Sequence, residues 1–186
     1  MLNLNFNPFP QMQTERLHIR RLTAADTDNM FLLRSNKEAM KYIGRPIPTE
    51  KKEVEDLIKK INDNIQSNTG IVWGISLKNE PALIGTIGFH RIEIENYRAE
   101  VGYMLMPDYW HQGFMDEVLE EVLTFGFMQL NFHSIEAKID PGNTKSRNIL
   151  LKKGFIKEAY YKENFYFNGK FLDSEIYSLL KSNFIK

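Results

Sequence analysis

Hydrophobic positions change their spacing along the chain, and the spacing predicts which segments form strands and which form helices. In residues 14–22, Leu17 and Ile19 alternate with charged residues, a period of two that is typical of a half-buried strand. Thr23 then has the character of a helix N-cap. We predict that a helix follows it, with Met30, Leu33 and also Leu32 facing inward.

A second helix is predicted after a chain-breaking stretch with two prolines at residues 45–48. Thr49 is a suitable N-cap for it, and apolar residues then recur three and four positions apart, with lysine and glutamate on the other face. The apolar face consists of Val54, Leu57, Ile58, Ile61 and Ile65.

The middle of the chain is rich in β-branched and aromatic residues, which favours strands. Three such segments, residues 71–77, 82–94 and 99–106, are separated by turn-forming residues, and Pro107 ends the third. We therefore expect a three-stranded antiparallel meander.

The last third of the chain alternates helical and extended patterns. An apolar helix is expected over residues 114–129, with Val118, Val122 and Phe125 on one face, and a strand over residues 134–140. A helix from about Thr144 to Lys153, with Gly154 as its C-cap, comes next, and a hairpin turning at Asn168 and Gly169 ends the chain. The order predicts one α+β domain over residues 1–186, an α/β/α sandwich with a mixed, mostly antiparallel sheet and helices on both faces. Residues 1–12 are expected to be a loosely ordered extension.

Composition excludes several classes of function. Lysine plus arginine equals aspartate plus glutamate at 24 each, so no overall field attracts DNA or an anionic membrane. The chain has no cysteine, which excludes disulfides and thiolate sites, and its four histidines are scattered, so no metal site is expected. Neither a signal peptide nor a run of 18 apolar residues is present, so a cytoplasmic protein is expected.

The stretch YWHQGFMDEV, residues 109–118, is the strongest candidate for chemistry. A helix that begins directly after a strand and a tight loop presents unpaired N–H groups and the positive end of its dipole, which together bind phosphate. Gly113 allows close approach of the ligand to the backbone. Asp116 and Glu117 leave open the alternative that no anion binds here. Carboxylates in the first turn of a helix stabilise the helix by roughly 0.3–1 kcal/mol each and can take the place of a bound anion.

Four stretches, in order, resemble the GNAT superfamily of N-acetyltransferases, within it the branch that acetylates N-termini of ribosomal proteins. They are TERLHIRRLTAAD, AEVGYMLMPDYWHQGFMDEVL, IDPGNTKSRNILLKKGF and NGKFLDSEIYSLL. The resemblance implies a splayed strand pair, acetyl-CoA as co-substrate and no metal. The family loop reads Gln/Arg-x-x-Gly-x-Gly/Ala; here Met115 replaces the last small residue and Asp116 a common threonine or serine.

Transfer of acetyl to an amine requires a base, because α-amino groups and lysines are largely protonated at pH 7. Glu100 is our candidate, since it shares a strand face with Gly102 and Met104; Glu93 and Glu95 are weaker alternatives. The resemblance implies that Ser146 donates a proton to the departing sulfur, although helix capping by Asn143 and Ser146 is the alternative. The implied acetyl-CoA contacts are Met104, Leu105, Met106, His111, Gln112, Gly113, Phe114, Met115, Asp116, Asn143 and Ser146, with Arg147 and Lys152 near the phosphates.

The resemblance implies that the acceptor is the α-amino group of a protein N-terminus, with a ribosomal protein as the first choice. A small-molecule amine such as an antibiotic or polyamine is the alternative, and a non-catalytic acyl-CoA-binding module is a second. One or two of the aromatic residues Trp73, Phe89, Tyr97, Tyr103 and Tyr109 are expected to reach the acceptor. Monomer and homodimer both remain open.

Overall fold

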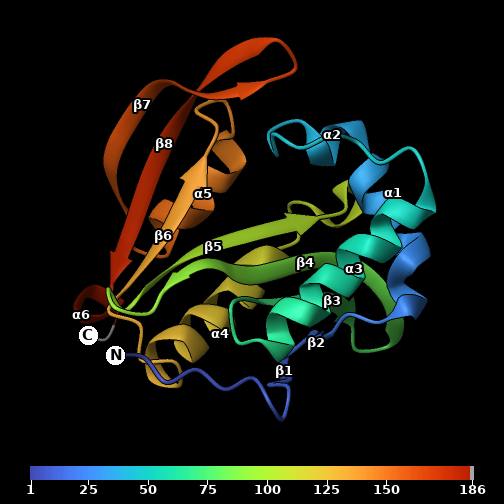
Figure 1. Ribbon diagram of the computed structural model, residues 1–186, viewed down its shortest axis with the longest axis horizontal. Helices are drawn as coiled ribbons and strands as arrows, with labels where there is room; N and C mark the ends of the chain where they lie inside the picture. The colour runs from blue at the N-terminus through green and yellow to red at the C-terminus, as the bar shows by residue number, and fades with distance from the viewer. Residues whose placement is uncertain (185–186) are drawn as a thin grey trace.

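The computed structural model describes residues 1–184 and consists of one mixed sheet with helices on both faces (Figure 1). Within these residues the sheet has eight strands in the order β1-β2-β3-β4-β5-β6-β8-β7. Neighbouring strands are antiparallel except β5 and β6, which are parallel. The fold class expected from the sequence is confirmed. The strands are β1 (Met12–Gln13), β2 (Leu17–Arg21), β3 (Ile71–Leu77), β4 (Glu80–Glu93), β5 (Arg98–Leu105), β6 (Ser134–Ile139), β7 (Ile156–Phe167) and β8 (Lys170–Leu180).

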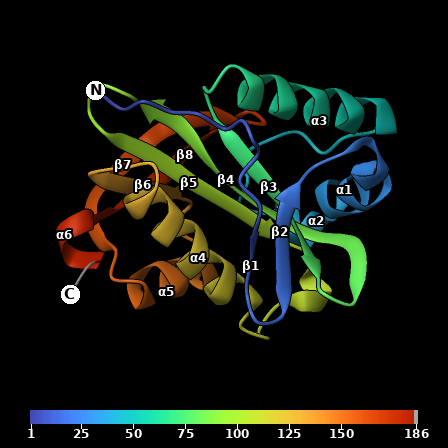
Figure 2. The same cartoon turned by 90° about the horizontal axis from the view of Figure 1, so that it is seen from below.

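Helices cover both faces of the sheet, with α1 and α3 on one side and α4 and α5 on the other (Figure 2). Each has the apolar stripe that its spacing predicts, and the interior of the sandwich is formed where these stripes meet the sheet. Among the described residues, no helix has the length and apolar character needed to cross a bilayer. The helices are η1 (Ala24–Asp26), α1 (Thr27–Ser35), α2 (Lys37–Met40), α3 (Lys51–Gln66), η2 (Pro107–Tyr109), α4 (Phe114–Met128), α5 (Thr144–Lys152) and α6 (Lys181–Phe184).

Three details of the predicted helices are wrong. Leu32 is 60% exposed rather than facing inward, because Met30 and Leu33 already occupy the buried side of α1. The N-cap of α3 is Glu50, not Thr49, whose N–H instead donates to the Glu53 carboxylate at 2.7 Å. The short helix α2 was not predicted at all, since four residues carry no readable period.

The N-terminal segment is not a loose extension. Leu2, Leu4 and Phe6 are buried in the core, and the segment runs along the sheet towards β1 (Figure 2). The Phe6 N–H donates to Asn68 Oδ1 at 2.8 Å, and the Trp73 indole N–H donates to the Pro10 carbonyl at 2.6 Å. Burial of three alternating apolar side chains outweighs the entropy of a free end, so the expectation for residues 1–12 is corrected.

The C-terminal features follow the prediction. Asn168 and Gly169 have φ values of 48° and 79°, which is the type I′ turn that their sequence favours, and they join β7 to β8. Gly154, with φ of 86°, follows the end of α5 and allows the chain to reverse into β7.

The parallel strands β5 and β6 separate half-way along β5. Their pairing runs from Arg98 with Ser134 to Glu100 with Glu136, while β5 remains paired with β4 as far as Leu105. Beyond Glu100, β6 turns away with β8 and β7, and the divergence is visible in Figure 1. The second half of β5 therefore has a backbone edge that β6 does not cover.

Candidate active site

The uncovered edge of β5 presents main-chain groups of alternate residues. The Met106 N–H donates to the Ile84 carbonyl at 2.8 Å, so the main-chain groups of Met106 point towards β4. The main-chain groups of Met104 point the same way, because the direction alternates along a strand. Val101, Tyr103 and Leu105 consequently turn their N–H and C=O groups to the opening. Main-chain contacts to acetyl-CoA were expected from Met104, Leu105 and Met106. The ladder with β4 uses the groups of Met104 and Met106, so that expectation is corrected for these two, and a contact from Leu105 stays a prediction.

Glu100 lies where the two strands separate, as the sequence-based hypothesis requires. Its side chain is 19% exposed, and Arg91 Nη1 lies 3.0 Å from Oε2 as an ion pair rather than as an aligned hydrogen bond. Burial raises the pKa of this carboxyl above its ordinary value, although the charge of Arg91 opposes the rise. A carboxylate that titrates closer to neutral pH is suited to accept a proton from an ammonium group.

The other acidic candidates do not reach the opening. Glu93 pairs across the ladder with Arg98, in the closed half of the β5 strand, and its carboxylate accepts a bond from Asn96 at 2.8 Å. Glu95 is exposed in the turn between β4 and β5. Among the three acids, Glu100 alone has the required position.

Ser146 and Tyr103 meet on the opposite face of β5 from Glu100. Their hydroxyl oxygens are 2.8 Å apart, which links β5 to the first turn of α5 across the point of divergence. Burial raises the pKa of Tyr103 to about 12, with the bond to Ser146 opposing, so the phenol keeps its proton at neutral pH. Asn143 caps α5 by accepting from the Ser146 N–H at 3.1 Å, which is the capping role that the sequence left open.

The loop before α4 has the backbone of an anion site. His111 and Gly113 have φ values of 61° and 78°, and residues 111–113 are exposed. A positive φ at histidine is a strained conformation that the surrounding structure must hold. A Cβ on Gly113 would meet only Arg16 Nη2, at 3.5 Å, so space lies in front of the helix. In the part of the chain that the structure describes, no side chain makes an N-cap hydrogen bond to α4. The amides of its first turn are therefore free to bind an anion.

The residues that depart from the family loop do not fill this space. Phe114 and Met115 are buried in the core, which leaves only their main chain to face a ligand. Asp116 contacts Lys152, the last residue of α5, at 2.9 Å and Lys153, the C-cap of that helix, at 3.2 Å. Burial raises the pKa of Asp116, but its hydrogen bonds with the two lysines outweigh this and hold the value below the ordinary range. Glu117 pairs with Arg16 at 2.7 Å.

A surface hollow of about 540 Å³ borders the same loop from the outer side of α4. Gly113, Arg16 and Lys153 contribute to its wall, but so do four carboxylates. An acidic wall repels phosphate, so the free amides at the helix end, and not this hollow, are the better place for the anion. The four carboxylates belong to Asp116, Glu117, Glu120 and Glu121.

Two basic residues expected near phosphates are occupied elsewhere. Arg147 donates to the Glu175 carboxylate at 2.9 Å and to the Pro141 carbonyl at 2.6 Å, which joins α5 to β8. Lys152 is held by Asp116. Of the aromatic candidates, Trp73 and Phe89 are fully buried, Tyr97 lies in a turn, Tyr109 packs on Phe114, and Tyr103 alone lies beside the opening.

Arg16 lies beside the candidate anion site and was not predicted from the sequence. Its guanidinium donates to the Gln112 carbonyl at 3.0 Å, lies 4.4 Å above the Phe114 ring and pairs with Glu117. It thereby fixes the loop to the start of β2. Alternation placed Arg16 on a solvent-facing side of that strand, and nothing in the local pattern indicates a partner about a hundred residues away.

Comparison with known proteins agrees with this geometry. Residues 16–156 match the family model described as acetyltransferase (GNAT) domain. The chain is 36% identical to "Uncharacterized N-acetyltransferase YoaA" of Bacillus subtilis (strain 168), over 93% of this chain and 98% of that protein. A crystal structure of an acetyltransferase (GNAT family) from Bacillus anthracis superposes with a TM-score of 0.82 at 26% identity, covering 93% of this chain and 99% of the other.

Two more distant relatives carry names that specify an acceptor. "Spermidine N(1)-acetyltransferase" of Vibrio cholerae is 26% identical over 91% of this chain and 96% of its own length. "Ribosomal-protein-serine acetyltransferase" of Escherichia coli (strain K12) is 28% identical over 67% of this chain and 70% of its own. The family model spans most of the chain and includes the strand divergence, the uncapped start of α4 and the half-buried Glu100. This chain therefore belongs to the GNAT family and is an acetyltransferase.

Proposed function

We propose that this chain transfers the acetyl group of acetyl-CoA to the α-amino group of a protein N-terminus. The name of the Escherichia coli relative, "Ribosomal-protein-serine acetyltransferase", supports a protein as the acceptor. The observation that carries the proposal is the separation of β5 from β6 directly after Glu100. It leaves a free backbone edge between a candidate base on one face and the Tyr103–Ser146 pair on the other.

Acetyl-CoA supplies an acetyl group activated as a thioester. The exposed amides of residues 112–116 would hold its pyrophosphate, and the main-chain groups of Tyr103 and Leu105 would hold its pantetheine amides in the manner of an added strand. A Leu105 or Tyr103 N–H facing the opening is also the available donor for the oxyanion. The Leu105 carbonyl already accepts from the Trp110 indole at 2.8 Å, which fixes the end of the strand.

Glu100 and the hydroxyl pair divide the proton transfers between the two faces of β5. Glu100 accepts the proton that the acceptor amine must lose, directly or through water. Ser146, hydrogen bonded to Tyr103, donates a proton to the departing thiolate, and Tyr103 can replace that proton because its phenol remains protonated.

An α-amino acceptor is supported by its acidity. Its pKa of about 8 makes deprotonation at neutral pH far easier than for an alkylamine with a pKa above about 10. A polyamine is the second candidate, supported by the name of the Vibrio cholerae relative. A module that binds acyl-CoA without turnover is the third candidate. It has less support, because such a module has no step in which the half-buried Glu100 would accept a proton.

The direct test is release of free CoA from acetyl-CoA in the presence of N-terminal peptides, spermidine and antibiotic amines, followed with a thiol reagent. Acetylated peptide identified by mass spectrometry, with the acetyl on the α-amino nitrogen, is the expected result. Release with spermidine alone would establish the second candidate. Tight binding of acetyl-CoA without release on any amine would establish the third.

Tyr103→Phe is expected to lower kcat by about 10- to 100-fold, at the lower end of proton-transfer effects because the Ser146 hydroxyl remains. The KM for acetyl-CoA stays nearly constant, since the lost hydroxyl acts on the leaving group. Tyr109→Phe is the matched control, because Tyr109 packs on Phe114 away from Ser146. Equal rates for the two variants would remove Tyr103 from the mechanism.

Asp116→Ser is expected to tighten acetyl-CoA binding about 3- to 10-fold, because it removes a negative charge from the first turn of α4, an effect on the order of 1 kcal/mol. It also frees Lys152 and Lys153 to approach the phosphates. Calorimetry gives the dissociation constant, and Asp56→Ser on the exposed face of α3 removes an equal charge elsewhere. Unchanged binding would show that the charge of Asp116 does not oppose the phosphates, and weaker binding would show that Asp116 helps to arrange the site.

A further inference from the structure

Positive side chains gather around Glu100 on the face of the sheet that α1 covers. Arg91 lies 3.0 Å from the Glu100 carboxylate, and Arg34, on α1, donates to the Met104 sulfur at 3.6 Å. Glu100 pairs in register with Glu136, so Lys138, two residues further along β6, shares that face. We call Arg34, Arg45, Arg91 and Lys138 the basic cluster.

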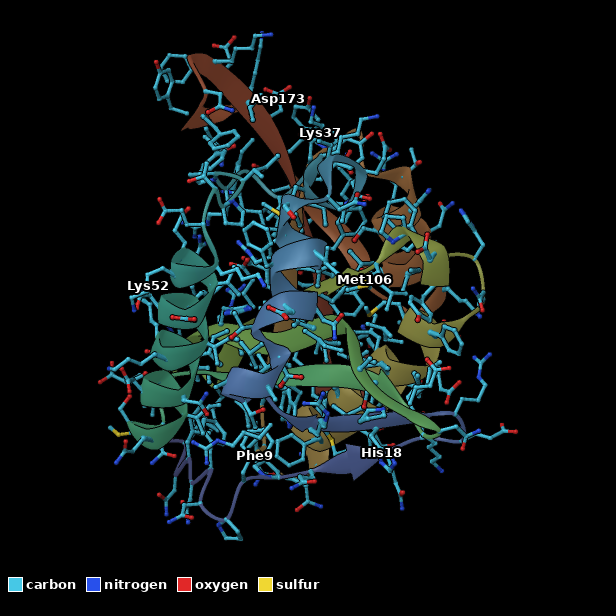
Figure 3. All side chains as sticks on the ribbon, turned by 90° about the vertical axis from the view of Figure 1, so that its right-hand side faces the viewer. Phe9, His18, Lys37, Lys52, Met106 and Asp173 are labelled. Carbon is cyan, nitrogen blue, oxygen red and sulfur yellow. The ribbon has the colours of Figure 1, made fainter. Side chains whose placement is uncertain are left out.

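Arg45 is held opposite β6 by a close contact between two distant segments. Gly44 has φ of 59°, and a Cβ there would lie 2.6 Å from Phe165 Cε1, so this loop rests directly on the β7–β8 hairpin. Lys138 Nζ lies 5.8 Å from the same Phe165 ring. Figure 1 shows that α2 and the loop after it lie on the side of the hairpin that faces the divergence of β5 and β6. Figure 3 shows Lys37 of α2 and Asp173 of β8 at the same end of the molecule. The loop after α2 therefore carries Arg45 over the region where β5 and β6 diverge.

The basic cluster has more positive charge than its surroundings neutralise. Within residues 1–184, no carboxylate oxygen lies within 4.0 Å of the charged groups of Arg34, Arg45 or Lys138. Burial, and then the charge of Arg45, lower the pKa of Arg34 below its ordinary value. A half-buried guanidinium has five donors, and the one side-chain partner of Arg34 is a thioether, whereas arginine in such a position is ordinarily paired with an anion.

His90 lies on the same face of the sheet as the basic cluster. It pairs across the ladder with Glu100 and lies against Gly102, where an added Cβ would be 3.3 Å from its ring. His90 is exposed, and partial loss of solvation is the largest cause of a pKa below the ordinary value, with the charges of Arg91 and Arg45 adding to it. The two arginine contributions are consistent with positive charge gathered at this position.

We propose, resting on the function proposed above, that the acceptor is an anionic amine: a molecule with a carboxylate close to the amino group, which Arg34, Arg45 and Lys138 bind while the amine faces Glu100. Arginine binds carboxylates in a bidentate manner, which also orients the acceptor. A positive field destabilises an ammonium ion, so the same cluster favours the neutral, reactive amine. A polyamine has no group to offset that repulsion.

The carboxylate can come from acidic residues early in a peptide or from a small amino acid. The peptide arm compares three C-terminally amidated peptides that begin with serine and carry two aspartates, two asparagines or two lysines at the next positions. The small-molecule arm compares amino acids with their carboxamides, and spermidine represents cationic acceptors. Rates are compared at equal concentration of neutral amine, so that differences in amine pKa do not enter.

We expect kcat/KM to be at least about tenfold higher for the acidic member of each pair, and lowest for the lysine peptide and spermidine. Arg45→Glu and Lys138→Glu are each expected to reduce the acidic-to-neutral ratio by about tenfold, mainly through KM. Arg34→Gln reduces the ratio too but also removes the contact with the Met104 sulfur, so Arg45→Glu and Lys138→Glu carry the test. Lys60→Glu, on the exposed face of α3, is the matched control.

The outcomes separate this inference from the proposed function. Acetylation without preference for acidic acceptors, or a preference that survives Arg45→Glu and Lys138→Glu, overturns the inference and leaves acetyl transfer intact. Failure of every amine to release CoA overturns the proposed function itself. An unchanged dissociation constant for acetyl-CoA in the two variants shows that they are folded and that any altered ratio belongs to the acceptor.

Discussion

Replacing Glu100 with glutamine is expected to lower kcat/KM for amine acetylation by about 10²–10⁴-fold, the range for loss of a general base. Glutamine keeps the shape of the side chain but cannot take a proton at neutral pH. The affinity for acetyl-CoA should hardly change, because the expected contacts of that ligand lie further along β5 and at the start of α4. Steady-state kinetics with a peptide acceptor, together with calorimetry for acetyl-CoA, measure the two effects separately.

The pH dependence makes the test specific. The wild-type rate should fall as the pH drops through the pKa of Glu100, which burial places above the ordinary value for glutamate, and the variant should lack this acidic limb. Glu93→Gln is the control, since it changes an exposed acid in the closed part of the sheet. An acidic limb that persists in Glu100→Gln would assign the base to another group.

The same pKa shift predicts how stability responds. A carboxyl whose pKa is raised on folding binds more protons in the folded state, between its unfolded and folded pKa values, so its contribution to stability decreases as the pH rises through that window. Glu100→Gln removes this unfavourable ionisation. The variant should therefore unfold at the same or a higher temperature than the wild type above that window, which excludes misfolding as the cause of its lower rate.

Phe6→Ala is expected to lower the free energy of unfolding by roughly 3–5 kcal/mol, the typical cost of truncating a buried phenylalanine. Phe6 is 2% exposed, and its loss would leave a cavity under a segment that has one main-chain bond to Asn68. For a chain of this size, each kcal/mol corresponds to about 2–4 °C in the unfolding midpoint. Thermal and urea unfolding are suitable measurements.

Phe171→Ala is the matched control, because Phe171 is 65% exposed on β8 and its truncation should change stability little. A Phe6→Ala variant as stable as this control would restore the view of residues 1–12 as a loose extension. Loss of stability with acetyl-CoA affinity retained would show instead that the segment supports the core and not the site.

Hydrophobic periodicity predicted most of the fold because long elements bury a regular stripe. The α3 and α4 faces, the β3–β4–β5 meander and the Asn168–Gly169 turn all have local causes and were predicted correctly. The exceptions are short or terminal. Leu2, Leu4 and Phe6 alternate as a strand would, but whether such a segment packs depends on a partner surface formed by β3 and the turn near Asn68.

The positions of the candidate residues could be predicted where a single strand or helix determines them. Glu100 and Gly113 follow from a strand period and from a strand–loop–helix junction, and the structure places them as those patterns require. Contacts between elements are a different matter. No local pattern records a contact between segments more than 40 residues apart, and three contacts near the candidate site are of this kind: Arg16 with Glu117, Tyr103 with Ser146, and Arg34 with Met104.

Calorimetric titration with acetyl-CoA, and in parallel with acetyl-pantetheine, measures what the phosphates contribute to binding. If the start of α4 holds the pyrophosphate while the β5 edge holds the pantetheine arm, acetyl-CoA binds at micromolar concentration. Acetyl-pantetheine then binds at least about 100-fold more weakly, because it lacks the phosphates and the adenosine, and added salt narrows the difference. Equal affinity for the two ligands, or no binding of acetyl-CoA at millimolar concentration, would contradict a phosphate site at the start of α4.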